Sequence, residues 1–150
     1  MIAWRRSQGL APMPEVWVLT SGRRPLPAEV LAAWAETRPV RVLAPVRMQL
    51  PERVAWTRLD DFRALAPLMR AQGASLALFA AGGVLFRRIL AEGLIDELFL
   101  TQRLVVLAGR PYATLAEGEA LAFPAGFALA GLWYDEGVRP AQLILRLRRA

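Results

Sequence analysis

The chain has 150 residues, a length that suits one domain able to bury a core, and its formal net charge is +6. It contains neither cysteine nor histidine, which excludes disulfides, thiolate metal sites and the usual zinc, copper and general-base chemistry of histidine. All 19 basic residues are arginine, so lysine-based catalysis is excluded, while fork-shaped cations suited to phosphate are abundant.

The positive charge is scattered along the chain. Only Arg146, Arg148 and Arg149 form a dense group, and their alternation with leucine is typical of the solvated face of a strand. A nucleic-acid-binding role would therefore depend on net charge alone, and we expect neither a nucleic acid nor a membrane as partner. No uninterrupted apolar run reaches membrane-spanning length and the N-terminus lacks the order of a signal peptide, so we expect a cytoplasmic protein.

The first half of the chain reads as an alternation of strands and helices. Residues 1–14 contain Gly9, Pro12 and Pro14 and show no period, so we expect an irregular lead-in. The strand-like apolar runs are 15–20, 40–44, 54–56 and 75–79. A helix over 27–36 is predicted from Pro27 at its start and an apolar stripe of Val30, Leu31 and Trp34.

A second helix begins after Asp60 or Asp61, either of which can cap it. Its predicted buried stripe consists of Phe62, Leu65, Leu68 and Met69, and Gly73 ends it. Strands that alternate with helices in this way are typical of a mainly parallel sheet.

A glycine turn follows the run 75–79, which we expect to be an inner strand. Gly82 and Gly83 precede a helix that ends near Glu92, with Gly93 as its stop. A strand that passes through glycines into a helix directs free N–H groups and the positive end of the helix dipole at one place, which is a geometry for anions. The alternative is that the glycines only allow a tight turn.

The C-terminal part has a different pattern. The runs 98–101 and 104–107 are almost continuously apolar, as expected of strands covered on both faces. The runs 127–134 and 141–148 are joined by a loop centred on Gly137, which predicts an antiparallel hairpin. The sheet should therefore become mixed at its end.

Two motifs in this order resemble a known family. The Ala81-Gly82-Gly83 turn and the sequence Gly-Leu-Ile-Asp-Glu-Leu at 93–98 are similar to motifs of the reductase domain of the bifunctional riboflavin-biosynthesis deaminase/reductase and of the pyrimidine reductases. The resemblance implies an α/β, three-layer, dihydrofolate-reductase-like fold over residues 1–150. It also implies an NADPH-dependent reductase that acts on a phosphorylated pyrimidine.

The resemblance also implies site residues. Ser21, at a strand end, would touch the nicotinamide cofactor. Our own hypothesis for the 2′-phosphate of this cofactor is Arg23 or Arg24. A local turn bond is the alternative for Ser21. The helix start, formed by Gly82, Gly83, Val84 and Leu85, would hold the pyrophosphate, and the substrate would meet Arg5 and Ala81. Catalytic residues stay unassigned, and the protein does not need many of them, because in hydride transfer the cofactor carries the chemistry.

The sequence departs from the family at two points. Ala81 stands where the family has a substrate-binding glutamate, and nothing matches the family's first strand with its lysine, aspartate and Ala-Asp-Asp-Pro motif. We therefore expect NADPH binding with little reductase activity. A non-catalytic relative that keeps the fold for binding or assembly is the alternative. We also expect a homodimer that buries the C-terminal strands and the Trp133 region.

Asp96 and Glu97 are adjacent acidic residues, but neighbours on a strand point to opposite faces. They cannot act together on one substrate. We expect a turn bond for Asp96 and a salt bridge for Glu97.

Overall fold

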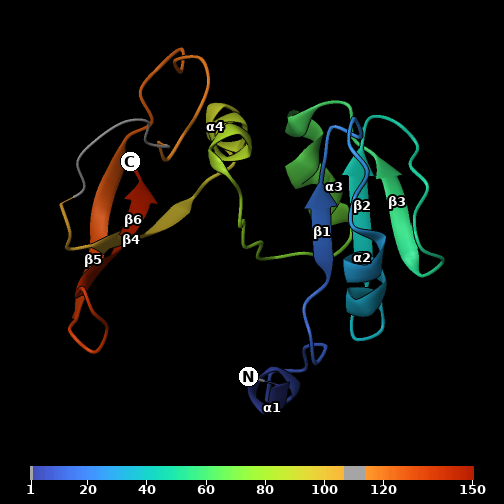
Figure 1. The fold of residues 1–150 in the computed structure, drawn as a ribbon, viewed down its shortest axis with the longest axis horizontal. Helices are drawn as coiled ribbons and strands as arrows, with labels where there is room; N and C mark the ends of the chain where they lie inside the picture. Colours follow the sequence, from blue (N-terminus) through green and yellow to red (C-terminus); the bar gives the residue numbers. More distant parts are fainter. Residues whose placement is uncertain (1, 107–113) are drawn as a thin grey trace. The chain divides into compact units, whose positions relative to one another are not determined.

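The computed structural model of the chain describes residues 2–106 and 114–150. These residues group into two compact units, Met1–Leu65 and Ala66–Ala150 (Figure 1). Each unit contains its own three-stranded sheet. That the whole chain acts as one domain stays a prediction.

The first unit begins with a helix, α1 (Ile2–Ser7), where an irregular segment was expected. The expectation was wrong because the breakers Gly9, Pro12 and Pro14 all lie beyond the helix, so alanine and arginine can propagate one short turn before them. Gly9 follows with a φ of 68°.

The sheet of the first unit is entirely parallel, and the predicted parallel pairing is confirmed. The prediction of a single sheet that becomes mixed at its end is wrong, because the described antiparallel strands form a second sheet. Its strands, in the order β1-β2-β3, are β1 (Val16–Leu19), β2 (Val40–Ala44) and β3 (Val54–Arg58). Val16 is paired with Val40, and Val40 with Val54, so the three strands start in register. Because parallel strands share their direction, their carboxyl ends meet at one edge of the sheet, the edge where ligands bind in open α/β sheets.

The core of this unit lies between the sheet and α2 (Ala28–Ala35). Leu31 packs in one buried cluster with Val40, Val42 and Val54. The expected stripe of α2 was partly wrong, because Val30 and Trp34 are each 42% exposed and only Leu31, at 2%, is buried. Leu31 is thus the one fully buried residue of α2, and Ala35 at the end of the helix is partly buried against the same cluster.

The next helical segment agrees with the sequence prediction. It consists of a 3₁₀ turn, η1 (Phe62–Ala64), continued by α3 (Leu65–Ala71). Asp61 is the cap, and its carboxylate accepts a hydrogen bond from the backbone N–H of Arg63 at 2.9 Å. Leu65 is fully buried, and Gly73 ends the segment with a φ of 78°.

The predicted inner strand at 75–79 is wrong. These residues form no strand, and Leu76 and Leu78 are 80% and 87% exposed. The backbone of 75–81 makes no hydrogen bond to another described residue. An apolar run of strand length is only a candidate, because a strand exists only where a neighbouring backbone pairs with it.

The second unit contains residues 66–71 of α3, a nine-residue helix and an antiparallel sheet. The helix is α4 (Gly83–Ala91), and the strands are β4 (Glu97–Arg103), β5 (Phe127–Asp135) and β6 (Gln142–Arg149). The strand order is β4-β6-β5, so β6 lies in the middle (Figure 1). The predicted hairpin of β5 and β6 is confirmed, with a bulge between Leu129 and Gly131.

The strand register separates two faces of this sheet. Residues directly opposite one another share a face. Leu98, Leu147 and Leu129 form one cross-strand row, and Leu100, Leu145 and Leu132 form another on the same face. The other face carries the rows of Arg146 and Arg148. The predicted alternation of leucine and arginine along β6 is therefore confirmed.

The expected burial of β4 on both faces is wrong. Phe99 is exposed on the arginine face, and burial alternates from Leu98 to Thr101, with Leu98 and Leu100 half-buried and Phe99 and Thr101 exposed. The second apolar run, from Leu104, does not form a strand in the described residues 104–106, and residue 107 lies outside them. Because an antiparallel sheet can face water on one side, a continuously apolar strand does not need cover on both.

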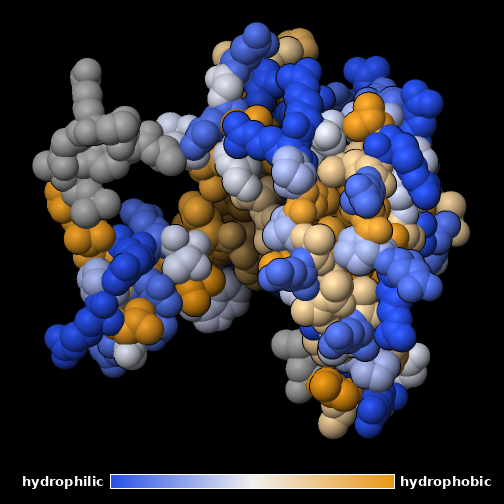
Figure 2. Space-filling view, turned by 45° about the vertical axis from the view of Figure 1, so that its right-hand side comes forward, coloured by the Kyte–Doolittle hydropathy of each residue, from blue (hydrophilic) through white to orange (hydrophobic). Residues whose placement is uncertain are grey.

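The α/β fold class is confirmed, with parallel strands in the first unit and antiparallel strands at the C-terminal end. In the space-filling view, hydrophobic residues lie at many points of the visible surface, separated by hydrophilic ones (Figure 2). Among the described residues there is no helix with both the length and the apolar character needed to cross a membrane.

We expect Leu31→Ala to lower the free energy of unfolding by about 2–5 kcal/mol, because it leaves a cavity against Val40, Val42 and Val54. Val30→Ala, one residue earlier on the same helix but exposed, should change it by no more than about 0.5 kcal/mol. Urea unfolding followed by circular dichroism measures both. Equal effects of the two substitutions would contradict the packing described for α2.

Candidate cofactor site

The loop after β1 is one half of the predicted site. The backbone N–H of Thr20 donates to the carbonyl oxygen of Leu43 at 3.0 Å, which continues the β1-β2 pairing one residue past the strand. Ser21 follows and is exposed. Its Oγ accepts a long hydrogen bond from the N–H of Arg23, at 3.4 Å, so the alternative turn bond is present. An exposed hydroxyl with such a weak bond keeps its proton available for a ligand.

Gly22 is required by the geometry of this loop. Its φ is 73°, and a Cβ at this position would lie 2.4 Å from Cγ2 of Val46. The turn after β1 therefore packs closely against the turn after β2. Only glycine combines the left-handed backbone with this approach.

Arg23 and Arg24 extend the same loop and are exposed. Neither guanidinium has an ion pair or a side-chain hydrogen bond to another described residue. Their charges are therefore available to an anion at the carboxyl edge of the sheet.

The start of α4 is the other half. Gly82 is the N-cap residue, with φ −72° and ψ 164° and no capping side chain. The carbonyl oxygen of Gly82 accepts the first helical bond, from the N–H of Phe86 at 2.9 Å. The N–H groups of Gly83, Val84 and Leu85 have no acceptor among the described residues. This part of the prediction, Gly82 and Gly83 at the N-terminus of the helix, is confirmed.

A loop of the same unit lies against this helix start. The N–H of Glu117 donates to the carbonyl oxygen of Gly83 at 3.1 Å. A Cβ on Gly83 would lie 2.7 Å from Cγ of Glu117 and 3.0 Å from the carbonyl oxygen of Thr114. The sequence reasoning did not identify Glu117. Its carboxylate is favoured by the helix dipole but opposes a second anion there.

The remaining predicted residues of this half are Ala81, Val84 and Leu85. Ala81 and Val84 are exposed and Leu85 is half-buried. The methyl group of Ala81 offers no hydrogen bond to a substrate. The Ser21 loop and the α4 start belong to different units, so their meeting in one cleft stays a prediction.

Arg5, the predicted substrate-phosphate residue, lies on α1. Its Nε donates to the carbonyl oxygen of Ala11 at 2.7 Å. The bond holds Arg5 against the lead-in of its own unit and uses one of its five N–H groups. A role toward substrate stays a prediction.

Glu97 forms the salt bridges that the sequence led us to expect. Arg146 donates to both of its carboxylate oxygens, at 2.7 and 2.9 Å, and Arg148 donates to Oε1 at 2.8 Å. These hydrogen bonds lower the pKa of Glu97 from an ordinary 4.5 to about 2, and the bond from Arg146 has the largest effect. Asp96 takes part differently, because its backbone carbonyl oxygen accepts from the N–H of Arg149 at 2.9 Å. The turn bond expected of the Asp96 side chain is wrong, because its carboxylate has no hydrogen bond among the described residues. Glu97 has a structural role and is not a proton donor at neutral pH.

One arrangement at the carboxyl edge was not found from the sequence. The guanidinium carbon of Arg47 lies over the ring of Trp56, 5.1 Å from its centroid. Only its position in the sequence could have pointed to Arg47 as a site residue, because it follows β2 as Ser21 follows β1.

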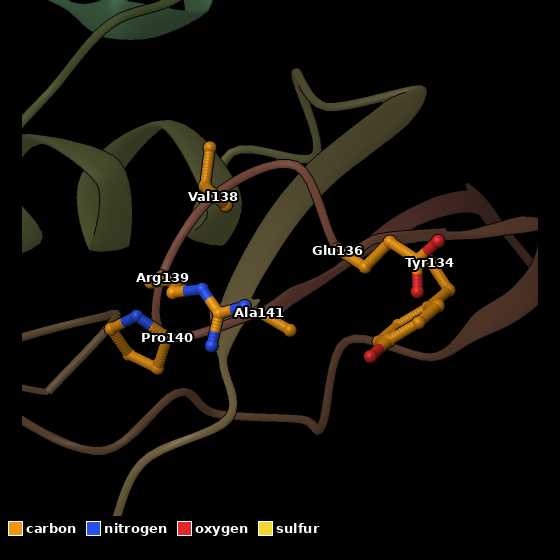
Figure 3. Close-up of a pocket in the computed structure, with 6 residues that line it drawn as sticks. All are labelled: Tyr134, Glu136, Val138, Arg139, Pro140 and Ala141. Carbon is orange, nitrogen blue, oxygen red and sulfur yellow. The ribbon is translucent and has the colours of Figure 1, made fainter.

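The connection of β5 and β6 forms a separate hollow of about 520 Å³ (Figure 3). Its lining residues are Tyr134, Glu136, Val138, Arg139, Pro140 and Ala141. None of the predicted site residues contributes to it. No group of three acidic residues that could hold a metal ion occurs in the described part of the chain.

No model of a known protein family matches the sequence, and no curated protein matches it. Solved structures do match. A pyrimidine reductase-like protein from Corynebacterium diphtheriae superposes with a TM-score of 0.72 at 16% identity, over 99% of this chain and 66% of that one. RibD from Acinetobacter baumannii matches with a TM-score of 0.68 at 27% identity, over 89% of this chain and 37% of that one.

A third match is the deaminase/5-amino-6-(5-phosphoribosylamino)uracil reductase from Thermotoga maritima, with a TM-score of 0.65 at 14% identity over 91% of this chain and 38% of that one. The chain thus spans less than two thirds of the length of these structures. The structural neighbours are thus a pyrimidine reductase-like protein, a RibD protein and a deaminase/reductase, as the sequence motifs indicated, and this chain has their fold.

We expect acid to destabilise the protein partly through Glu97. Because its pKa is lowered on folding, the stability that its ion pairs add is complete above about pH 4.5 and is lost as the pH falls toward 2. Glu97→Gln should unfold at lower urea concentration than wild type at pH 6, and the difference should shrink at pH 3. Glu52→Gln, an exposed control, should follow wild type throughout. A constant Glu97→Gln deficit from pH 6 to pH 3 would contradict this role.

Proposed function

We propose that this protein is an NADPH-dependent reductase of the riboflavin-biosynthesis type, which reduces 5-amino-6-(5-phosphoribosylamino)uracil or a closely related phosphorylated pyrimidine. The observation that carries the proposal is the match to RibD, at 27% identity over 89% of the chain, together with the Gly-Gly turn and the Gly-Leu-Ile-Asp-Glu-Leu motif. The neighbour from Thermotoga maritima is itself named for this reductase activity.

The chemistry available to the chain supports this class of reaction. Histidine, cysteine and lysine are absent, and Glu97 is held by two arginines. Hydride transfer needs few acid-base groups from the protein, because the cofactor supplies the reacting atom and the protein binds and orients it. The free N–H groups of α4 fit a pyrophosphate, and Ser21 and Arg24 fit another part of the cofactor, with Arg24 toward the 2′-phosphate.

A second candidate is a relative that binds the cofactor without efficient catalysis. Ala81 favours it, because an exposed methyl group replaces a glutamate that contacts substrate in the family. The two candidates share NADPH binding and differ in substrate-dependent NADPH oxidation.

Assembly as a homodimer belongs to the same proposal. Leu129 and Leu132, on the edge strand β5, are 60% and 54% exposed on the leucine face, and edge strands with apolar side chains pair readily. Trp133 lies on the opposite face, in the row of Ile144. Light scattering at increasing protein concentration tests the dimer, and a constant monomer mass would refute it.

We expect Gly82→Asp to weaken NADPH binding at least about fivefold, measured by calorimetry. A negative charge near 4 Å from the pyrophosphate costs about 1–4 kcal/mol for effective dielectric constants between water and a protein surface. Gly82→Asn is the matched control, since both side chains cap the helix and only one is charged. Position 82 has room for either side chain, because a Cβ there meets nothing within 4 Å. A side chain at position 83 would instead clash with Glu117.

Equal NADPH affinity of the Gly82→Asp and Gly82→Asn variants would place the pyrophosphate elsewhere. A wild-type chain that binds none of NADPH, NADP⁺ and NADH would refute the proposed function itself.

We expect Ala81→Glu to raise substrate-dependent NADPH oxidation by about tenfold, as a restored charged hydrogen bond to substrate should. Ala81 is exposed and precedes the helix, so the longer side chain fits. Ala81→Gln, which lacks the charge, is the control. If turnover is absent in wild type and in both variants while NADPH still binds, the non-catalytic candidate is favoured.

A further inference from the structure

Residues that follow β1 and β2 lie together at the carboxyl edge of the first unit's sheet. The close approach of Gly22 to Val46 places the turn of Ser21 beside the turn that carries Arg47. A ligand that reaches the Ser21 loop therefore has Arg47 within its surroundings.

Arg47 is held in position by β3. The indole Nε1–H of Trp56 donates to the carbonyl oxygen of Val46 at 3.0 Å, and the guanidinium of Arg47 lies over the same indole ring. One aromatic side chain thus fixes both the backbone and the cation of this turn. Pre-organisation of this kind lowers the entropy lost when a long side chain binds a ligand.

The charge of Arg47 is not neutralised. Other arginines of the β2-β3 sheet have acidic partners: Arg41 pairs with Glu15 at 3.2 Å, and Arg58 pairs with Asp60 at 2.7 Å. Arg47, like the nearby Arg23 and Arg24, has no carboxylate partner among the described residues. Three uncompensated guanidinium groups at one edge favour a dianion.

We propose that Arg47, positioned by Trp56, binds the 2′-phosphate of the cofactor's adenosine and so makes the site select NADPH over NADH. The inference rests on the proposed function. With one face of the guanidinium on the indole, its opposite face can take a purine ring and its N–H edges can donate to a phosphate monoester. Arg24 and Arg23 then add to the positive electrostatic potential around the phosphate. Arg47 makes the decisive contact, because it is the one guanidinium of the three that an aromatic ring holds in position.

The test compares ligands that differ by one phosphate. Adenosine 2′,5′-bisphosphate and adenosine 5′-monophosphate are titrated into wild type and into Arg47→Gln by calorimetry. We expect Arg47→Gln to lower the affinity for the bisphosphate about tenfold or more, because a charged hydrogen bond is lost. The affinity for the monophosphate should change by no more than about twofold. Arg53→Gln removes one charge beside the amino end of β3 and should leave both affinities unchanged.

Trp56 is tested as a positioning residue. Trp56→Phe keeps an aromatic face for Arg47, whereas Trp56→Leu does not. We expect the bisphosphate affinity to fall about threefold to tenfold in Trp56→Leu and to be largely recovered in Trp56→Phe, with the monophosphate affinity unchanged in both. Circular dichroism confirms that each variant is folded before titration.

The outcomes separate this inference from the proposed function. If wild type binds NADPH but Arg47→Gln keeps the full preference for the bisphosphate, or Arg24→Gln alone removes it, the inference about Arg47 is wrong and the function stands. If Arg47→Gln instead loses affinity for ribose 5-phosphate only, the residue serves the substrate and the inference is wrong. If the bisphosphate binds through Arg47 but no NADPH-dependent reduction occurs, the inference stands and the reductase function fails.

Discussion

The first unit depends on the position of β2, which pairs in parallel with β1 on one side and β3 on the other. Val40 and Val42 from one face pack with Leu31, while Leu43 from the other is also buried. Because all three strands run the same way, every loop at their carboxyl ends is brought to one edge. Ser21, Arg47 and Asp60 follow β1, β2 and β3, so the direction of the strands is enough to place all three at this edge.

The second unit is organised by a different constraint, the ion pairs across β4 and β6. Arg146 meets both oxygens of Glu97, and Arg148 meets one. They lie on a partly exposed face, so they are screened by salt and fix the strand register more than they stabilise the fold. On the opposite face, leucines supply the hydrophobic contacts. Glu97, which forms with Asp96 what resembles a catalytic pair in sequence, is thus an element of sheet architecture.

The two halves of the candidate site differ in how they attract an anion. At the Ser21 loop, the positive charge comes from arginine side chains without acidic partners. At the start of α4 it comes from backbone N–H groups and the helix dipole, and Glu117 partly offsets it. Side-chain forks suit a monoester phosphate, whereas backbone N–H groups suit a pyrophosphate.

The sequence by itself determined the elements whose signals are local. An apolar run predicted β2, single residues predicted a cap at Asp60 or Asp61 and the glycines around α4, and the alternation of arginine with leucine predicted the solvated face of β6. Tertiary structure decided what depends on distant partners. Leu76 and Leu78 have the pattern of a strand but pair with no backbone among residues 2–106 and 114–150, and Val30 has the pattern of a core residue but is 42% exposed. The approach of Glu117 to Gly83 and of Trp56 to Arg47 could not be predicted, because burial, pairing and neutralisation are properties of contacts between residues far apart in the chain.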